Sequence, residues 1–327
     1  MKAIVCKAYG PSETLSFEEV GDAPAPAAGQ VLVRVAAAGV NFLDTLIIEG
    51  KYQVKPPTPF SPGAEVAGVI AAIGSGVSGF SIGDRVLAIT GYGGFAEYVA
   101  VDVSGRVLHL PDTMDFATAA GFGIAYGTSL YALRERGQLR AGETLLVLGA
   151  GGGVGITACE IGAVLGARVI AAASTAEKLA NAVRAGASVT INYREESIKS
   201  RIKALTGGEG VDMLYDPVGG DLFDEAMRLV GWNGRIVVVG FASGRIPQLP
   251  ANLLLLKGIS AIGIRLGGFR ERETDAHKAM FEDLFRWHAE GKLHPQISVK
   301  APLEQAAQVL AAVAQREVLG KAVLTVG

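Results

Sequence analysis

Short apolar runs alternate with amphipathic segments through the middle of the chain. The apolar runs hold few polar side chains, which is typical of parallel strands covered by helices on both faces, and the segments between them have helical periodicity. The pattern predicts strands at residues 145–148, 168–173, 188–192, 211–216, 235–240 and 259–264, and helices at 156–165, 176–184, 198–205 and 222–230. This alternation predicts a doubly wound α/β domain.

The segments on either side of this domain have a different pattern. Before it, short apolar or alternating runs are separated by Gly and Pro clusters, which predicts a compact, mostly antiparallel β domain. Its expected strands are 2–7, 30–38, 65–73, 85–89 and 95–101. Two helical patterns (275–290 and 303–315) and a closing strand (322–326) form a tail that we expect to pack back on the β domain. We therefore assign 1–124 and 264–327 to one domain and 125–263 to the other.

A glycine-rich loop follows the first strand of the α/β domain. The stretch Ala150-Gly151-Gly152-Gly153-Val154-Gly155 fits the pattern G-x-G-x-x-G with Ala in the first position, and a helical segment follows at once. Glycines let the backbone pass close to phosphates, and the first N–H groups of a helix point at an anion. A glycine-rich structural turn is the alternative, but the flanking strand and helix favour a dinucleotide site.

Length, charge and cysteine content exclude several classes of protein. The chain has 327 residues, half of them hydrophobic, and a net charge of −2. This length supports two domains. The slightly negative net charge does not indicate binding to nucleic acid or to an anionic membrane surface. No apolar run reaches the length of about 18 residues that a membrane span needs, and the N-terminus lacks the apolar core of a signal peptide. Cys6 and Cys159 have no metal-ligand spacing, so we expect two buried thiols in a reducing cytoplasm.

Several motifs occur in a fixed order along nearly the whole chain. They are Asn41-Phe42-Leu43-Asp44 with Gly50-Lys51-Tyr52, Pro62-Gly63-Ala64-Glu65-Val66-Ala67-Gly68, Gly83-Asp84-Arg85-Val86, Gly94-Phe95-Ala96-Glu97-Tyr98, Gly127-Thr128-Ser129 and Asp216-Pro217-Val218-Gly219-Gly220. Together with the glycine loop, this ordered set resembles the zinc-free quinone oxidoreductases, the zeta-crystallin-like branch of the medium-chain dehydrogenase/reductase superfamily. The resemblance implies an α/β protein with a GroES-like β-rich catalytic domain and a Rossmann cofactor domain. It also implies a homodimer joined through the cofactor domain, with the apolar stretch 253–256 as a candidate edge; burial of that stretch within the subunit is the alternative.

The same positions argue against a catalytic metal. In the zinc-dependent members of the superfamily a Cys stands where this chain has Asn41 and a His where it has Ala64, and Asn and Ala cannot replace those ligands. The four-cysteine structural zinc lobe is also missing. Without zinc, hydride delivery to a quinone or a polarised alkene suits the chain better than alcohol oxidation. We expect surface or locally hydrogen-bonded side chains at the four histidines, which show no paired ligand spacing: His109, His277, His288 and His294.

The end of the second predicted strand bears on the choice between NADH and NADPH. NAD-binding folds often place an acidic residue there, whereas this chain has Ala173 and Ser174, so no carboxylate would repel a 2′-phosphate. Lys178 follows within one helical turn, although a solvated lysine on the helix face fits the sequence equally well. The resemblance adds Tyr193 and Arg316 as further phosphate contacts, and together these features favour NADPH.

The resemblance also implies which residues surround the cofactor. The glycine loop lies on the pyrophosphate, Thr128 and Asn41 approach the nicotinamide end, and the loops after the fifth and sixth strands complete the site. Phe241 could instead be a core aromatic at a strand end. The full set is Asn41, Tyr52, Thr128, Gly151, Gly152, Gly153, Val154, Ser174, Lys178, Tyr193, Val218, Gly240, Phe241, Ala242, Ser243, Ile264, Arg265, Leu266 and Arg316.

The expected chemistry is hydride transfer by proximity, with water excluded. A quinone needs little acid catalysis because its reduced oxygens take protons from solvent, so NADPH-dependent quinone reduction is the first hypothesis. The second is reduction of an activated α,β-unsaturated carbonyl such as an enone, an acrylate or an enoyl thioester. That reaction needs a hydrogen-bond or proton donor, for which Asn41, Asp44 and Tyr52 are the candidates. A structural role is the alternative for Asp44 and for Tyr52.

The position of Arg265 bears on the acceptor, and a function of another class is a third hypothesis. If Arg265 faces the site, an anionic acceptor becomes plausible, whereas an outward, solvated Arg265 is the alternative. A crystallin-like or RNA-binding protein that retains NADPH binding is a hypothesis of another class. The chain has no basic stripe, which argues against RNA.

Overall fold

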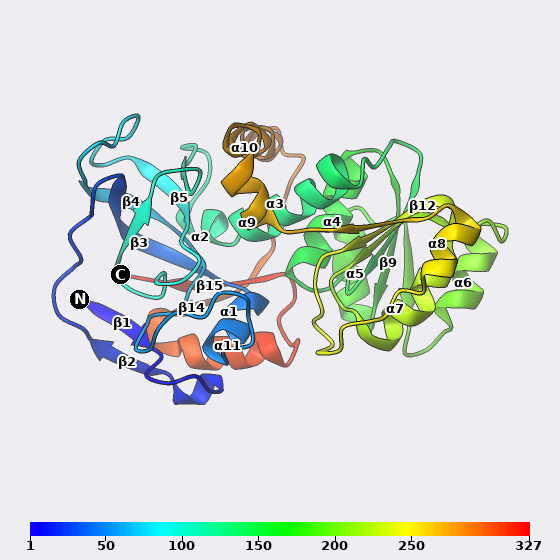
Figure 1. Cartoon of the computed structure of the whole chain (residues 1–327), viewed down its shortest axis with the longest axis horizontal. Coiled ribbons are helices and arrows are strands. Elements are labelled where there is room, and N and C mark those ends of the chain that lie inside the picture. The colour runs from blue at the N-terminus through cyan, green and yellow to red at the C-terminus, as the bar shows by residue number, and fades with distance from the viewer. The chain divides into compact units, whose positions relative to one another are not determined.

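The computed structural model describes residues 1–327, and the chain divides into two compact units (Figure 1). Unit 1 consists of Met1–Ile124, Gly268–Ala289 and Pro295–Gly327, and unit 2 of Ala125–Gly267 and Glu290–His294. No helix in the structure has both the length and the apolar character that crossing a membrane requires.

Unit 1 is built on a seven-stranded sheet in the order β14-β15-β3-β4-β5-β7, with β6 also paired to β3. All pairs are antiparallel except β14 with β15. The strands are β3 (Gln30–Val40), β4 (Glu65–Ile73), β5 (Arg85–Ile89), β6 (Tyr98–Asp102), β7 (Val107–His109), β14 (Ile297–Pro302) and β15 (Lys321–Thr325), with β1 (Lys2–Val5) and β2 (Ser16–Glu19) as a separate hairpin. Because β15 pairs with β3, the C-terminal tail completes the sheet of the N-terminal segment.

Five α-helices lie wholly or mostly in unit 1. They are α1 (Phe42–Ile48), α2 (Phe116–Ala120), α9 (Leu266–Arg272), α10 (Thr274–Ala289) and α11 (Ala306–Ala314). The core consists of the inward-facing apolar side chains of the strands, such as Val33, Val66 and Leu324, together with Val309 and Leu310 of α11. The predicted mostly antiparallel β-rich domain is therefore confirmed.

Unit 2 contains six parallel strands in the order β10-β9-β8-β11-β12-β13. The strands are β8 (Thr144–Leu148), β9 (Arg168–Ala173), β10 (Val189–Asn192), β11 (Val211–Asp216), β12 (Val230–Val238) and β13 (Ser260–Gly263). The helices are α3 (Gly123–Leu130), whose first two residues belong to unit 1, continued by the π-helical turn Tyr131–Arg136, then α4 (Gly153–Val164), α5 (Ala176–Arg184), α6 (Ile198–Leu205), α7 (Gly220–Ala226) and α8 (Ala251–Lys257). This is the strand order 3-2-1-4-5-6 of a Rossmann fold, so the predicted doubly wound domain is confirmed.

The connection from α7 to β12 differs from the prediction. The predicted helix 222–230 ends at Ala226, a 3₁₀ turn follows at Met227–Leu229, and Val230 already begins β12. The first part of that strand contains Asn233 in a left-handed conformation, and the pairing with β11 shifts register there. Glycine and a polar side chain in this stretch hide the start of the strand from a pattern of hydrophobic positions.

Candidate cofactor-binding and active site

The glycine loop lies between β8 and α4, at the carboxyl edge of the parallel sheet. The neighbours of β8 are β9 and β11, so the loop stands at the point where the strand order reverses, which is where doubly wound sheets bind ligands. Gly149 has φ +60°, and the Ala150 N–H donates to Ala172 O of β9 at 3.1 Å. These two features turn the chain sharply out of the strand.

The loop has an open side and a packed side. A Cβ on Gly155 would lie 2.2 Å from Gly149 O, so only glycine lets α4 begin this close to the loop. A Cβ on Gly152, the exposed N-cap of α4, would lie no closer than 3.6 Å to any other atom. The first N–H groups of α4 have no partner within the helix. An open glycine at the N-terminus of a twelve-residue helix fits a dinucleotide pyrophosphate.

A cluster of buried hydroxyl groups holds α3 against α4 and β11. Ser129 Oγ lies 3.0 Å from Val154 O, 2.8 Å from Thr157 Oγ1 and 3.0 Å from Tyr215 Oη. Thr128 is the neighbour of Ser129 on α3 and is half-buried. The sequence interpretation missed Ser129, Thr157 and Tyr215 as supporting residues, although Gly127-Thr128-Ser129 is one of the recognised motifs.

The residues expected around the ribose gather at the ends of β9 and β10. The Tyr193 N–H donates to Ala173 O at 3.2 Å, which brings the segment after β10 beside the end of β9. Thr175 caps α5 by accepting from the Lys178 N–H at 3.3 Å. A Cβ on Gly151 would lie 2.5 Å from Lys178 Cγ, so the Lys178 side chain runs directly over the glycine loop. The nearby Glu177 is exposed.

The loop after β11 is folded around one buried carboxylate. Asp216 Oδ1 accepts from the N–H groups of Val218 and Gly219 at 2.9 Å each. Burial raises the pKa of Asp216 to about 6, and the two backbone hydrogen bonds oppose that shift. The sequence interpretation placed Val218 at the cofactor but assigned no role to Asp216, which fixes the backbone of this loop.

The loop after β12 lies beside the loop after β11. The N–H groups of Ala242 and Ser243 donate to Pro217 O at 3.1 Å and to Val218 O at 2.8 Å. Phe241 is 37% exposed, so the alternative of a core aromatic does not hold. Gly240 precedes it, two residues after the last residue of β12.

The segment after β13 begins beside the end of β12. The Ile264 N–H donates to Val238 O at 3.1 Å, which ties this segment to the neighbouring strand. Arg265 is exposed and Leu266, the first residue of α9, is buried.

The expected catalytic residues of unit 1 lie where β3 passes into α1. Asn41 is the N-cap of α1, and its N–H donates to Asp44 Oδ2 at 2.8 Å. Asp44 is fully buried, and its Oδ1 has no hydrogen-bond partner. Burial raises the pKa of Asp44 to about 7, against the lowering effect of the Asn41 N–H and of the nearby Lys321. The position of Asp44 as acceptor for the N-cap supports a structural contribution.

Two buried residues that the sequence interpretation left without a role bind the Asn41 carboxamide. Lys321 Nζ donates to Asn41 Oδ1 at 2.5 Å, to Glu65 Oε1 at 3.1 Å and to Val40 O at 3.1 Å. Asn41 Nδ2 donates to Glu65 Oε1 at 2.8 Å, and the Ile124 N–H donates to Glu65 Oε2 at 2.7 Å. Lys321, Asn41 and Glu65 form what we call the amide clamp.

Tyr52 and Arg316 also belong to unit 1. Tyr52 follows α1 and is half-buried against the hydrophobic core of the unit. Arg316 follows α11 with φ +63°, and its N–H donates to Val313 O at 3.1 Å. Their contacts with a cofactor stay predictions.

No group of three or more His, Cys, Asp or Glu side chains is arranged to hold a metal ion in the structure. The expectation for the histidines is wrong at His277, which is fully buried with neither ring nitrogen hydrogen-bonded, because it packs between Phe269 and Phe281. His109 is locally bonded as expected, with Nε2 at 2.9 Å from Gly79 O.

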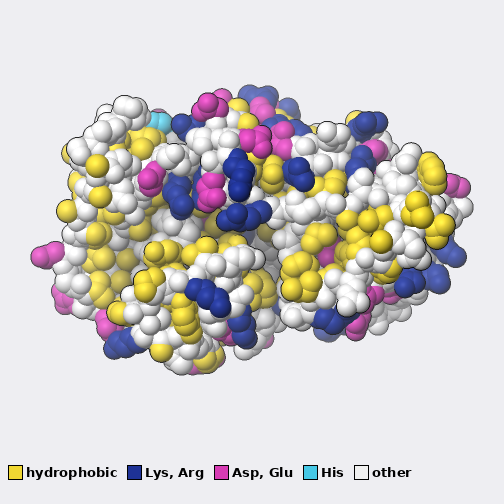
Figure 2. Space-filling model, in the orientation of Figure 1, with side chains coloured by type: hydrophobic (Ala, Val, Ile, Leu, Met, Phe, Trp, Pro, Cys, Tyr) yellow, Lys and Arg dark blue, Asp and Glu magenta, His cyan; other side chains and the backbone are white.

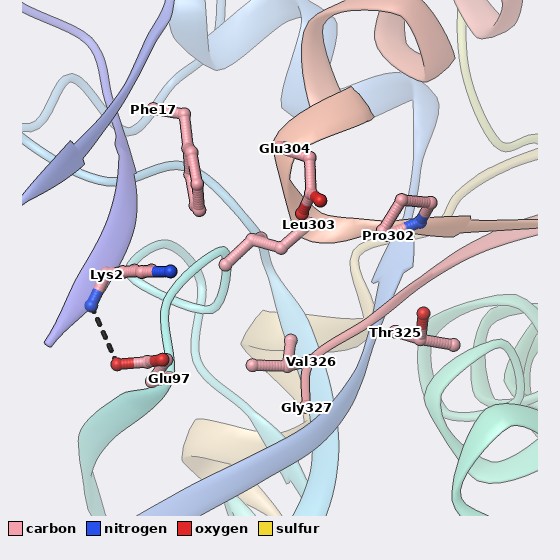
Figure 3. Close-up of a pocket in the computed structure, with 9 residues that line it drawn as sticks. All are labelled: Lys2, Phe17, Glu97, Pro302, Leu303, Glu304, Thr325, Val326 and Gly327. Atoms are coloured by element: carbon pink, nitrogen blue, oxygen red, sulfur yellow. Dashed lines mark hydrogen bonds between the residues drawn. The ribbon is translucent and has the colours of Figure 1, made fainter.

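A surface depression of unit 1 lies at the end of β15 opposite Lys321. It is lined by both ends of the chain, including Lys2, whose N–H donates to Glu97 Oε2 at 2.7 Å, and Thr325 (Figure 3). None of the residues expected to bind cofactor or substrate lines it.

Comparisons with known proteins agree with this architecture. Residues 27–112 match the alcohol dehydrogenase GroES-like domain, and residues 153–282 match the family described as zinc-binding dehydrogenase. The quinone oxidoreductase-like protein 2 homolog of Nematostella vectensis is 37% identical over 99% of this chain and 88% of its own length. The human quinone oxidoreductase is 35% identical over 94% of this chain and 92% of its own. The structure of Escherichia coli quinone oxidoreductase complexed with NADPH superposes with a TM-score of 0.93, at 30% identity, over 99% of this chain and 100% of that one.

The GroES-like unit, the Rossmann unit and the glycine loop define an NAD(P)-dependent oxidoreductase of the medium-chain dehydrogenase/reductase superfamily. Within that superfamily the chain belongs to the quinone oxidoreductase family, and the resemblance found from its motifs is confirmed.

Proposed function

We propose that the protein is a zinc-independent, NADPH-dependent reductase whose acceptor is a quinone. The observation that carries the cofactor choice is the end of β9, where Ala173 and Ser174 offer no carboxylate and Lys178 runs over the glycine loop. A lysine supplies charge for a phosphate, and an acidic residue at this place would select the unphosphorylated ribose. The related Escherichia coli enzyme was solved with NADPH, which supports the same choice.

The residues of unit 2 would hold the cofactor along the carboxyl edge of the sheet. The open side of the glycine loop at Gly152, with Gly153 and Val154 of α4, would face the pyrophosphate, and Ser174, Lys178 and Tyr193 would face the phosphorylated ribose. The loops held by Asp216 would line the route to the nicotinamide. When bound, the cofactor supplies a hydride, and the protein positions the acceptor and excludes water.

The side chains of unit 1 proposed for the active site suit an acceptor that needs little proton transfer. The Asn41 carboxamide can donate a hydrogen bond, and Tyr52 carries a phenol at moderate exposure. Asp44 is fully buried and bound to the N-cap of α1, so it orients the start of this helix rather than meeting an acceptor. Weak donors are sufficient for a quinone, whose reduced oxygens are protonated from water.

Reduction of an activated α,β-unsaturated carbonyl is the second candidate. The donor capacity of Asn41 and Tyr52 favours it, because an enone oxygen gains charge during the reaction. The exposed Arg265 could then attract a carboxylate-bearing acceptor.

We also expect a homodimer formed through unit 2. Strand β13 is the edge of its sheet, and an unpaired edge favours pairing with another strand. Leu255 and Leu256 of α8 are 82% and 70% exposed, and hydrophobic side chains gather over this helix (Figure 2). Leu253 and Leu254, in contrast, pack against the core of unit 2. Light scattering of the parent and of Leu255→Lys tests this proposal, which predicts a dimer that the lysine weakens.

A steady-state assay with a set of acceptors tests the reaction itself. NADPH oxidation with 1,4-benzoquinone should exceed oxidation with an enone and with an acrylate at equal concentrations. The two free, buried cysteines fit the reducing cytoplasm in which we expect the protein, so the assay belongs in reducing buffer. Activity confined to enone or acrylate acceptors would replace the quinone proposal with the second candidate.

A further inference from the structure

The amide clamp brings together three residues from adjacent strands of unit 1. Lys321 begins β15, Asn41 follows β3 and Glu65 begins β4, and these strands are neighbours in the sheet. The side chain of Lys321 is 5% exposed and that of Glu65 is fully buried, and Asn41 is 8% exposed. Charged groups buried to this degree are expensive to desolvate, and a buried ion pair is often no more stabilising than apolar side chains.

Two glycines make room for the Glu65 carboxylate. A Cβ on Gly39 would lie 2.6 Å from Glu65 Oε1, and one on Gly123 would lie 3.0 Å from Glu65 Oε2. Strand β3 and the start of α3 are therefore both shaped around this carboxylate. Each of its oxygens accepts a hydrogen bond from a fixed donor, Asn41 Nδ2 for Oε1 and the Ile124 N–H for Oε2.

The clamp permits only one orientation of the Asn41 carboxamide. In the observed orientation Oδ1 accepts from the Lys321 ammonium, and Nδ2 donates to the Glu65 carboxylate. The flipped amide would place a donor against the ammonium and an acceptor against the carboxylate, so both contacts would become repulsive. An ammonium cannot accept a hydrogen bond and an ionised carboxylate cannot donate one, so no rotation of either partner can rescue the flipped state. One N–H of Nδ2 is left over in the observed orientation.

We propose that Lys321 and Glu65 are positioning residues that fix Asn41 as a hydrogen-bond donor in the active site. This inference rests on the proposed function for the placement of residue 41 near the acceptor. On this inference the clamp contributes to substrate specificity, because a hydrogen-bond donor at residue 41 can bind the carbonyl oxygen of a quinone or enone. An amide free to flip would present its carbonyl oxygen for part of the time, which repels such an acceptor.

Side-chain NMR of ligand-free protein tests the positioning directly. In protein labelled with [¹⁵N]asparagine, the Asn41 Nδ2 signals are identified by their loss in Asn41→Ala. In the parent we expect one of the two Nδ2 protons to be shifted downfield by its hydrogen bond to the Glu65 carboxylate and to exchange slowly with water. Two Nδ2 protons in the parent with the shifts and the fast water exchange of a solvated asparagine would by themselves overturn the inference, whether or not any clamp variant folds.

A variant in which the clamp carries no charge provides a second test of the inference. The double variant Lys321→Met with Glu65→Gln removes both charges together and permits either amide orientation. We expect the downfield shift of the hydrogen-bonded Asn41 Nδ2 proton to be lost, its exchange with water to be at least about tenfold faster, and kcat to fall at least about tenfold. Adding Asn41→Ala to the double variant should cause no further loss beyond that of Asn41→Ala alone, whereas a purely structural clamp would give additive losses.

A matched control removes the two charges of an arginine–glutamate pair within unit 2. Arg235 Nη2 lies 2.6 Å from Glu143 Oε2 in unit 2, and Arg235→Met with Glu143→Gln should leave the Asn41 signals and kcat as in the parent. Parent-like signals in the clamp double variant would overturn the inference and leave the proposed reaction intact. Parent-like kcat in Asn41→Ala would instead overturn the placement of residue 41 in the proposed active site.

Discussion

The side chain of Lys178 packs over the Cα of Gly151, so that a Cβ there would lie 2.5 Å from Lys178 Cγ. The contact joins the first turn of α5 to the loop that begins α4. A lysine held at this place would bring its charge to the proposed phosphate sites. The contact therefore links the two parts of the proposed cofactor site that the sequence presents separately.

Gly152→Val should weaken cofactor binding without unfolding the protein. The Cβ has space, with Gly149 O at 3.6 Å, and the N-cap φ of −89° is accessible to valine, but the side chain would project from the open side of the loop. We expect the NADPH Kd, measured by fluorescence titration, to rise at least about tenfold, a loss of about 1.4 kcal/mol. Gly155→Ala is the contrasting variant, because its Cβ would meet Gly149 O at 2.2 Å and should lower Tm. Parent-like NADPH affinity in Gly152→Val would contradict the placement of the pyrophosphate.

Tyr52→Phe should separate proton assistance from binding. The ring keeps its packing against the core of unit 1, so Tm and the NADPH Kd should stay close to those of the parent. If the phenol assists at the acceptor oxygen, kcat/KM should fall about tenfold or more with an enone and much less with a quinone. Equal losses with both acceptors would show that Tyr52 positions ligands and does not assist proton transfer.

Asp44 should make the protein less stable as the pH rises. The pKa of its carboxyl is raised by burial from 3.8 to about 7, so the folded state binds more protons than the unfolded state between these values. Stability from the protonated form is full below pH 3.8 and is lost as the pH rises through 7, by up to about 4 kcal/mol at 1.36 kcal/mol per pH unit. Asp44→Asn stays neutral, so its free energy of unfolding should rise relative to the parent between pH 4 and 7. A constant difference between the two proteins across that range would refute this assignment.

The contribution of His277 to stability should depend on pH in the opposite direction. Burial lowers its pKa from 6.5 to about 4, with Arg270 and Lys278 contributing, so the unfolded state binds the extra proton between these values. Stability is therefore full above pH 6.5 and falls as the pH drops towards 4, by up to about 3 kcal/mol. His277→Leu should lose this dependence and also gain stability at pH 7, because two unpartnered ring nitrogens are removed. Urea unfolding at pH 4.5, 5.5 and 7 measures both effects.

Several strands and helices of unit 2 were predictable because the hydrophobic pattern that marks each of them lies within its own sequence. The bounds of β9, α5, α6 and β11 agree with the hydrophobic pattern. The amide clamp was not predictable, because Lys321 and Glu65 are 256 positions apart and meet only through the order of three strands. Lys321 stands at the start of an apolar strand, where a lysine usually extends into water. His277 was mispredicted for a similar reason, since its helical position does not show that Phe269 and Phe281 enclose it.

The most direct test of the account is kcat/KM for NADPH and for NADH with 1,4-benzoquinone at fixed salt. Charged hydrogen bonds to a phosphate contribute about 1.5–3 kcal/mol each, so two partly exposed contacts should give at least about tenfold preference for NADPH. Lys178→Ala should lower the NADPH value and leave the NADH value nearly unchanged, and Lys203→Ala, which removes an exposed lysine of α6, should change neither. A parent enzyme that uses both cofactors equally, with Lys178→Ala lowering both alike, would contradict the proposed phosphate site.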